Sequence, residues 1–227
     1  MSHCATTFAM VSLFSAAVLA RGEDRDVPAF HSVQIAAGIH GTVEIGPRRP
    51  VHLEADEKLL RLVETRVENG TLKVGFLPHT SWSGDSEVTV AIQTPELRSL
   101  GASGGSVVRA NFTRGAETGI QASGGSEIRA RGVDAQDLSI QGSGGAQLDV
   151  QGRADTLDLQ MSGGTQLHGR DLAVRDVSVQ ASGGSQGEFR ASGRIRGQLS
   201  GGSELHVSGG AKAKVATSGG SAIDVND

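Results

Sequence analysis

Seven copies of the tripeptide Ser-Gly-Gly follow one another at a nearly constant spacing from residue 103 onward. Successive copies are 20, 20, 19, 20, 18 and 18 residues apart and begin at Ser103, Ser123, Ser143, Ser162, Ser182, Ser200 and Ser218. A fixed period of this length indicates a repeat architecture, in which each unit buries its apolar face only by stacking on its neighbours. Because glycine reaches positive φ without steric cost, each copy predicts a sharp turn.

The residues on either side of each turn are apolar at alternate positions, which is typical of a strand with one buried face. With the serine counted as zero, position −3 holds Leu100, Ile120, Ile140, Leu159, Val179, Gly197 and Val215. Position +5 holds Val108, Ile128, Leu148, Leu167, Gly187, Leu205 and Ile223. A shorter third side contributes Phe112, Val133 and Leu172. The sequence therefore predicts an all-β fold, a right-handed parallel β-helix with coils of about 18–20 residues.

The fifth coil interrupts the apolar column at position +5. Gly187 leaves that position without a side chain, and Phe189, two residues later, is the largest residue of its own column. Because protein interiors are close-packed, we interpret this pair as a compensation of volume within one coil.

Residues 30–100 lack the tripeptide but keep alternating apolar residues, and we expect irregular leading coils that cap the solenoid. The segment 67–74 predicts a hairpin, since Asn69-Gly70 suits a type I′ turn. Leu59 to Val63, preceded by Asp56 as an N-cap, fits a short helix or an extended segment. We expect a short linker over 21–29 and a single β-helix domain over 30–227, with the repeats in 101–227.

Residues 1–20 have the pattern of a secretory signal peptide. An apolar run of about a dozen residues ends in Val18-Leu19-Ala20 and is followed by charged residues. This run is too short to span a bilayer, which takes about 20 residues. Removal of this segment would also remove Cys4, the only cysteine, so we expect an exported mature chain without thiol, disulfide or membrane span, in the periplasm, at the cell surface or secreted.

The composition argues against nucleic-acid binding. The 21 Lys and Arg residues are outnumbered by 25 Asp and Glu residues, and aromatic residues make up 3% of the chain. The chain thus lacks both the basic field and the aromatic side chains that hold phosphates and bases.

Several segments resemble one bacterial family, the putative auto-transporter adhesin, head GIN domain. The resemblance rests on Ala37-Gly38-Ile39, Val43-Glu44-Ile45, the segment 51–57, the Asn69-Gly70 hairpin, and the segment 94–100 leading into the first repeat. It spans about residues 30 to 225. It implies an exported all-β repeat domain with no established catalytic residue. We expect no cofactor.

Outward-facing columns are the candidate functional surface, because each coil adds a like residue beside the previous one. Position −2 forms an unbroken surface ladder of Gln121, Gln141, Gln160, Gln180 and Gln198. Stacked amides can bond to one another along the axis, as in cross-β ladders. The main interpretation is therefore structural, and the alternative is a flat sugar-binding strip.

Position +6 carries charged residues and histidines on successive coils. His168, Glu188 and His206 lie on three consecutive coils, with Asp149 and Asp224 on either side. Charge complementarity between neighbouring strands explains such a column. A second hypothesis is a transition-metal site made by the two imidazoles and the carboxylate.

Two function classes remain open at this stage. The favoured one is a non-catalytic exported envelope or surface protein, acting as a rigid scaffold or adhesin-like surface for a cell-surface glycan or an envelope protein. The alternative is a carbohydrate-active enzyme of the pectate-lyase-like kind, for which Trp82, with His79 and Asp85, marks a candidate site in the segment 78–85. Association through the open coil ends is also considered.

Overall fold

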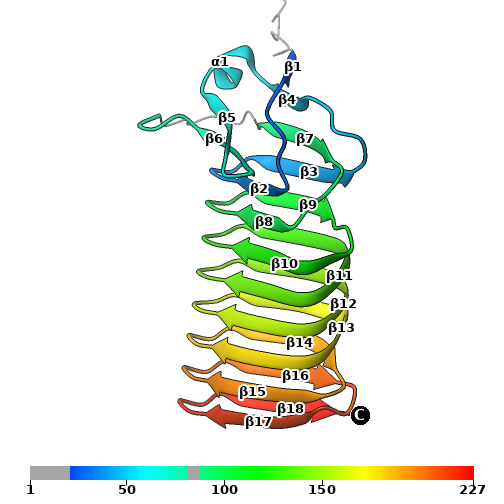
Figure 1. Ribbon diagram of the computed structural model, residues 1–227. Helices are drawn as coiled ribbons and strands as arrows, with labels where there is room; N and C mark the ends of the chain where they lie inside the picture. The colour runs from blue at the N-terminus through cyan, green and yellow to red at the C-terminus, as the bar shows by residue number, and fades with distance from the viewer. Residues whose placement is uncertain (1–20, 81–86) are drawn as a thin grey trace, which may run out of the picture.

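The computed structural model describes residues 21–80 and 87–227, which form a β-solenoid capped at its N-terminal end (Figure 1). The predicted parallel β-helix is confirmed, because the repeat strands pair in parallel and in the register that the columns require. Ile120 pairs with Ile140, and Ile128 pairs with Leu148. The described residues form 18 strands in one continuous sheet that folds around the core.

The strands form two long faces that meet at a bend. In spatial order, the first face consists of β5 (Val63–Glu68), β6 (Thr71–Phe76), β2 (Ser32–Ile35), β8 (Ser99–Ala102), β10 (Gly115–Ala122), the C-terminal parts of β11 (Glu127–Gly142), β12 (Gln147–Met161) and β13 (Gln166–Ala181), then β15 (Arg194–Leu199) and β17 (Lys212–Thr217).

In the repeat region, the second face carries the strand that follows each Ser-Gly-Gly turn. Its order is β1 (Arg21–Arg25), β4 (Val51–Ala55), β7 (Thr89–Thr94), β3 (His40–Ile45), β9 (Val107–Asn111), the N-terminal parts of β11, β12 and β13, then β14 (Gln186–Ala191), β16 (Glu204–Ser208) and β18 (Ala222–Asn226). The strands β11, β12 and β13 continue through the bend, where the pairing register shifts.

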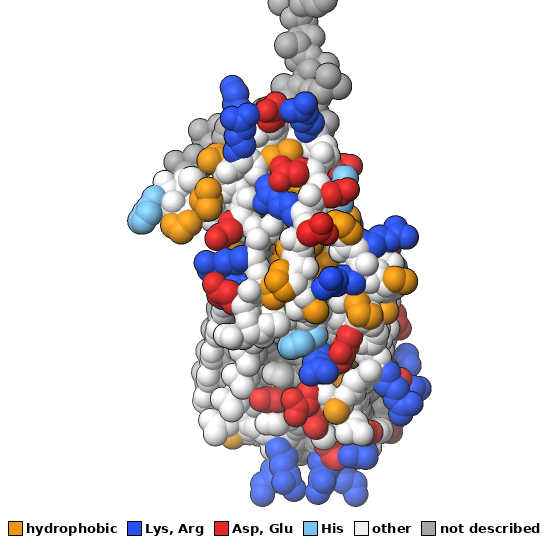
Figure 2. All heavy atoms as spheres, turned by 45° about the horizontal axis from the view of Figure 1, so that its top comes forward, with side chains coloured by type: hydrophobic (Ala, Val, Ile, Leu, Met, Phe, Trp, Pro, Cys, Tyr) orange, Lys and Arg blue, Asp and Glu red, His pale blue; other side chains and the backbone are white. Residues whose placement is uncertain are grey.

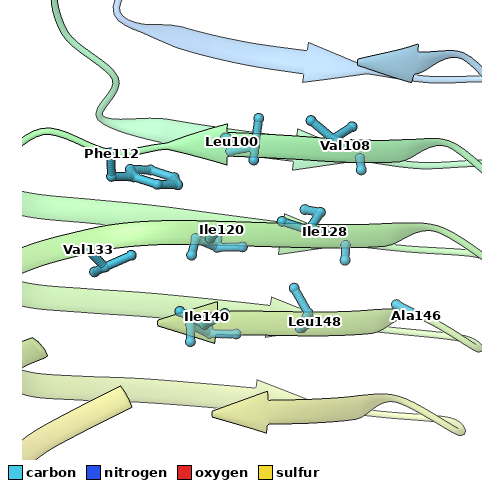
Figure 3. Close-up of a cluster of buried hydrophobic side chains, with 14 of the residues drawn as sticks. Leu100, Val108, Phe112, Ile120, Ile128, Val133, Ile140, Ala146 and Leu148 are labelled. Carbon is cyan, nitrogen blue, oxygen red and sulfur yellow. The ribbon is translucent and has the colours of Figure 1, made fainter. Parts of the chain in front are cut away.

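The core is built from the apolar columns named above. Leu100, Ile120 and Ile140 stack on the inside of the first face, opposite Val108 and Ile128 on the second (Figure 3). All five side chains are fully buried. The third side behaves as expected, since Phe112, Val133 and Leu172 are also buried.

The volume compensation predicted for the fifth coil differs in the structure. A Cβ on Gly187 would lie 2.8 Å from Leu205 Cδ2 and 3.2 Å from Met161 Cε, so these two side chains fill the space. Phe189 pairs instead with Gly169 of the previous coil. A Cβ on Gly169 would lie 3.4 Å from the Cβ of Phe189. Compensation therefore acts between coils, because side chains of stacked coils share one interior.

The N-terminal region is more closely integrated than the predicted leading coils. The coil formed by β2 and β3 lies between the pair β6 and β7 and the pair β8 and β9, so the order of coils in space differs from their order in the chain. The predicted hairpin is present as β5 and β6, with φ of 50° at Asn69 and 73° at Gly70. A short helix, α1 (Glu57–Leu60), begins at the N-cap Asp56 and buries Leu59 and Leu60.

Residues 21–25, expected to lie in a linker, form β1 and pair antiparallel with β4. The guanidinium of Arg25 explains this difference, because it donates to Leu60 O at 2.7 Å and Val63 O at 2.6 Å. Leu60 is the last residue of α1, and Val63 is the first residue of β5. The two hydrogen bonds of Arg25 thus hold β1 against the N-terminal cap.

Candidate binding groove along the glutamine column

Four of the seven Ser-Gly-Gly turns are closed by a buried hydroxyl three residues after the serine. The hydroxyls of Ser106, Thr165, Ser185 and Ser203 donate to the carbonyl of the turn serine at 2.7 to 2.8 Å, and all four residues are fully buried. This column of hydroxyls was not predicted from the sequence. Its signal is the small hydroxyl residue that follows most copies of the tripeptide, and its effect is to fix where the outward residues around each turn lie.

The glutamine column runs straight along the first face. Gln121 pairs with Gln141, Gln141 with Gln160, Gln160 with Gln180, and Gln180 with Gln198. All five side chains are exposed. The register therefore places five like amides on adjacent coils, at a strand spacing of about 4.8 Å.

The amides of this column are not bonded to one another. Among the residues that the structure describes, no hydrogen bond joins two glutamine side chains, and Gln160 Nε2 donates to Asp158 at 3.2 Å instead. The ladder of amide hydrogen bonds that the sequence favoured is thus not formed. Each primary amide can donate twice and accept twice, so the column presents unused hydrogen-bonding capacity to solvent.

A groove of about 830 Å³ follows this column. Its lining includes the exposed glutamines and the turn serines Ser103, Ser123, Ser143, Ser162, Ser182 and Ser200. From β8 to the end of the groove at Gln198 and Ser200, no lining residue is charged. Figure 2 shows the flank below the hairpin as a largely white surface, whereas charged side chains gather over the cap.

The hairpin of β5 and β6 closes the N-terminal end of the groove with charged side chains. The glutamine column continues past β8, because Gly101 pairs with both Gln121 and Gln34. Gln34 pairs in turn with Lys73, and Lys73 with Arg66, so these two cations extend the column into the hairpin. Both cations bond to Glu68, at 2.7 and 3.2 Å, and the hydrogen bond from Lys73 lowers the pKa of that carboxyl. Because these charges are paired within the hairpin, they create no strong electrostatic field at this end of the groove.

The second candidate column, at position +6, is aligned but does not assemble a metal site in the described residues. His168 pairs in register with Glu188, and Glu188 with His206. Glu188 accepts from Arg170 Nε at 2.7 Å and contacts His168 Nδ1 at 3.4 Å, and the bond from Arg170 lowers its pKa. His206 lies 3.2 Å from Glu204 and 3.9 Å from Asp224.

No group of three or more metal-ligating side chains is brought together in residues 21–80 and 87–227. The contacts of Glu188 with Arg170 and His168 agree with charge pairing between coils. The metal hypothesis stays a prediction that calorimetry with Zn²⁺ on the wild-type protein and the His206→Ala variant would test.

The candidate site in the segment 78–85 falls mostly outside the described residues, because these do not include Trp82 and Asp85. His79 is described and exposed. The expected signal peptide also lies outside them. No helix in the described part of the chain is long and apolar enough to cross a membrane.

The fold and the groove together define a class of protein, a β-solenoid that displays a repetitive polar surface. The chain belongs to the family described as putative auto-transporter adhesin, head GIN domain, whose model matches residues 29–211. This confirms the resemblance found in the sequence. Membership in an adhesin family indicates an exported or surface protein.

Solved structures with the same fold come from Bacteroides and Parabacteroides species. A putative adhesin from Bacteroides fragilis is 16% identical, with a TM-score of 0.83 over 92% of this chain and 97% of that one. A putative lipid binding protein from Parabacteroides distasonis is 15% identical, with a TM-score of 0.75 over 92% and 96%.

A putative adhesin from Parabacteroides merdae is 16% identical, with a TM-score of 0.73 over 92% and 96% of the two chains. At these identities the likeness shows the fold alone. A search of curated proteins finds no match.

Proposed function

We propose that this chain is an exported, non-catalytic surface protein that presents the glutamine groove as an adhesin-like contact surface on a rigid β-solenoid. The observation that carries the proposal is the groove itself, in which the five exposed amides are aligned by strand register and are not bonded to one another. The names of the similar structures, two of them putative adhesins, support the same direction.

The lining of the groove favours binding over catalysis. Hydrolysis or elimination on a sugar chain uses positioned acids and bases, commonly a pair of carboxylates. The only charged residues that line this groove are Glu64, Arg66 and Lys73, all on the hairpin at one end. No observation in the described residues supports the pectate-lyase-like alternative.

Adherence of protein-coated beads to intact cells and isolated envelopes tests the contact surface. The double variant Gln141→Arg and Gln180→Arg places two charged side chains in the groove, and we expect it to abolish adherence. The matched control is Gln147→Arg with Gln166→Arg, because these two glutamines pair in register on the second face of the same stack. Equal adherence of both variants would refute the proposed surface.

Export is tested separately on protein from the native cell. Cleavage after Ala20 would make Arg21, the first residue of β1, the amino terminus. Mass spectrometry should find this terminus in an envelope or extracellular fraction. Recovery of the chain from the cytosol with Met1 intact would contradict export.

A further inference from the structure

We propose that the groove binds a linear, uncharged polysaccharide laid along the axis of the solenoid, with successive sugar rings on successive coils. This inference rests on the proposed function, since it names the ligand class of the same groove. Three properties of the groove carry it: its charge, its hydrogen-bonding chemistry and its period.

The charge of the groove selects an uncharged ligand. From β8 to the far end, the lining contains glutamine, serine, alanine, glycine and one methionine, and the charges at the hairpin are paired with each other. A polyanion is held by a row of lysine and arginine residues, because its affinity comes from neutralised charge. Such a row is not found along this lining.

The hydrogen-bonding groups select a ligand that both donates and accepts. Each coil offers a primary amide and a hydroxyl, and both groups have donors and lone pairs. An apolar ligand would remove these groups from water without replacing their hydrogen bonds, which disfavours binding. Sugar hydroxyls replace them in both directions.

The period of the groove selects a polymer whose repeat matches one coil. Parallel strands of successive coils lie about 4.8 Å apart. An extended peptide advances about 3.3 Å per residue, so its side chains on one face recur about every 6.6 Å. This repeat does not match the spacing of the coils. A pyranose ring with its linking oxygen spans roughly one coil spacing. Each ring can therefore meet the amide and the hydroxyl of its own coil.

The same geometry predicts how affinity depends on ligand length. The coils that carry Gln121 to Gln198 contribute no aromatic residue to the lining, so contacts with a single sugar are expected to be weak. The translational entropy of the ligand is lost once, when its first ring binds. Each further ring adds contacts with another coil, so affinity should rise steeply with chain length. It should level off when the ligand covers the five glutamine coils.

Calorimetry with neutral glucan, mannan and xylan oligomers, from disaccharide to hexasaccharide, tests this inference. We expect at least one series to bind more tightly with each added ring. The double variant Gln141→Ala and Gln160→Ala, which removes two adjacent amides, should weaken binding about tenfold. The matched control Gln147→Ala with Gln166→Ala should bind as wild type. Unchanged urea midpoints would show that all variants fold.

The outcomes separate the ligand class from the proposed function. If no neutral series binds, if affinity does not rise with length, or if uronic acid oligomers bind more tightly than neutral ones, the ligand class is wrong. The bead assay would still support the contact surface in that case. If neutral oligomers bind as expected and groove variants adhere like wild type, the adhesin-like function is wrong and the ligand class stands.

Discussion

At the scale of single residues, the two glycines of the third tripeptide have different roles. Gly144 has a φ of +70°, and a Cβ there would lie 3.2 Å from the backbone nitrogen of Gly124 on the coil before. Gly145 is not among the residues with positive φ, and a Cβ there would meet nothing within 4 Å. In this copy the first glycine is therefore required by the backbone and by stacking, and the second is not.

This difference predicts opposite effects of alanine at neighbouring positions. Gly144→Ala should lower the free energy of unfolding by about 1–2 kcal/mol, the cost of a left-handed conformation for an L-residue. Gly145→Ala should leave it unchanged or raise it by about 0.4–1 kcal/mol, because the unfolded chain loses freedom. Urea denaturation measures both. Equal destabilisation by the two variants would contradict this account of the turn.

A second residue-scale prediction concerns the buried hydroxyl of the turn. Ser185 Oγ donates to Ser182 O at 2.7 Å and is fully buried. Ser185→Ala should cost about 1 kcal/mol, the usual net value of one hydrogen bond. Ala146 occupies the same position in the third copy, so Ala146→Ser serves as the reverse substitution in the same assay. An unchanged urea midpoint for Ser185→Ala would contradict the assigned role.

At the scale of elements, β1 depends on an ionisable contact. His52 of β4 lies 2.6 Å from Asp24 of β1 and 3.3 Å from Glu54, and hydrogen bonds to these carboxylates raise the pKa of His52. A histidine whose pKa is raised by folding stabilises the folded state. This stabilisation is fully present at any pH below the unfolded pKa of about 6.5. That contribution is lost as the pH rises through the higher folded pKa.

The pairing of β1 with β4 should therefore weaken as the pH rises above about 6.5 and through the higher folded pKa of His52. We expect the amide protons of β1 to exchange faster over this range in wild type, beyond the intrinsic change of exchange rate with pH. The Asp24→Asn variant loses the main cause of the raised pKa, so its exchange should show less of this extra dependence. The same pH dependence in both proteins would exclude the contact between His52 and Asp24 as its origin.

The regular elements could be predicted from the sequence because stacking repeats the same side-chain contact on every coil. The columns at −3 and +5 and the Asn69-Gly70 hairpin follow from period-two alternation and turn chemistry, which are local. The insertion of the β2–β3 coil between later coils was not predictable. Strand partners there are chosen by distant contacts, and no repeated motif marks them.

The candidate site was predictable in position but not in chemistry. The glutamine column could be read directly from position −2. Whether its amides bond to one another depends on side-chain rotamers, and whether a groove forms depends on the hairpin of β5 and β6 at its end. Similarly, spacing alone placed Glu188 beside His168, but the bond from Arg170 comes from a neighbouring strand. Local patterns carry no information about such competing partners.

At the scale of the whole molecule, stability should depend on where in the stack a coil lies. A solenoid is close to a one-dimensional system, in which each coil is stabilised by the coils on its two sides. Leu148 and Ile223 belong to the same column, at position +5. Leu148 is fully buried between the coils of Ile128 and Leu167, whereas Ile223 is only partly buried and pairs with Leu205 alone.

The same substitution at these two positions should consequently have unequal effects. Leu148→Asp buries an unpaired charge between two coils and should lower the free energy of unfolding by about 4 kcal/mol. Ile223→Asp leaves its carboxylate in contact with water and should cost about 1 kcal/mol. Urea denaturation followed by circular dichroism gives both values. Equal losses would show that the stack unfolds without regard to position, which would contradict a core built coil by coil from shared columns.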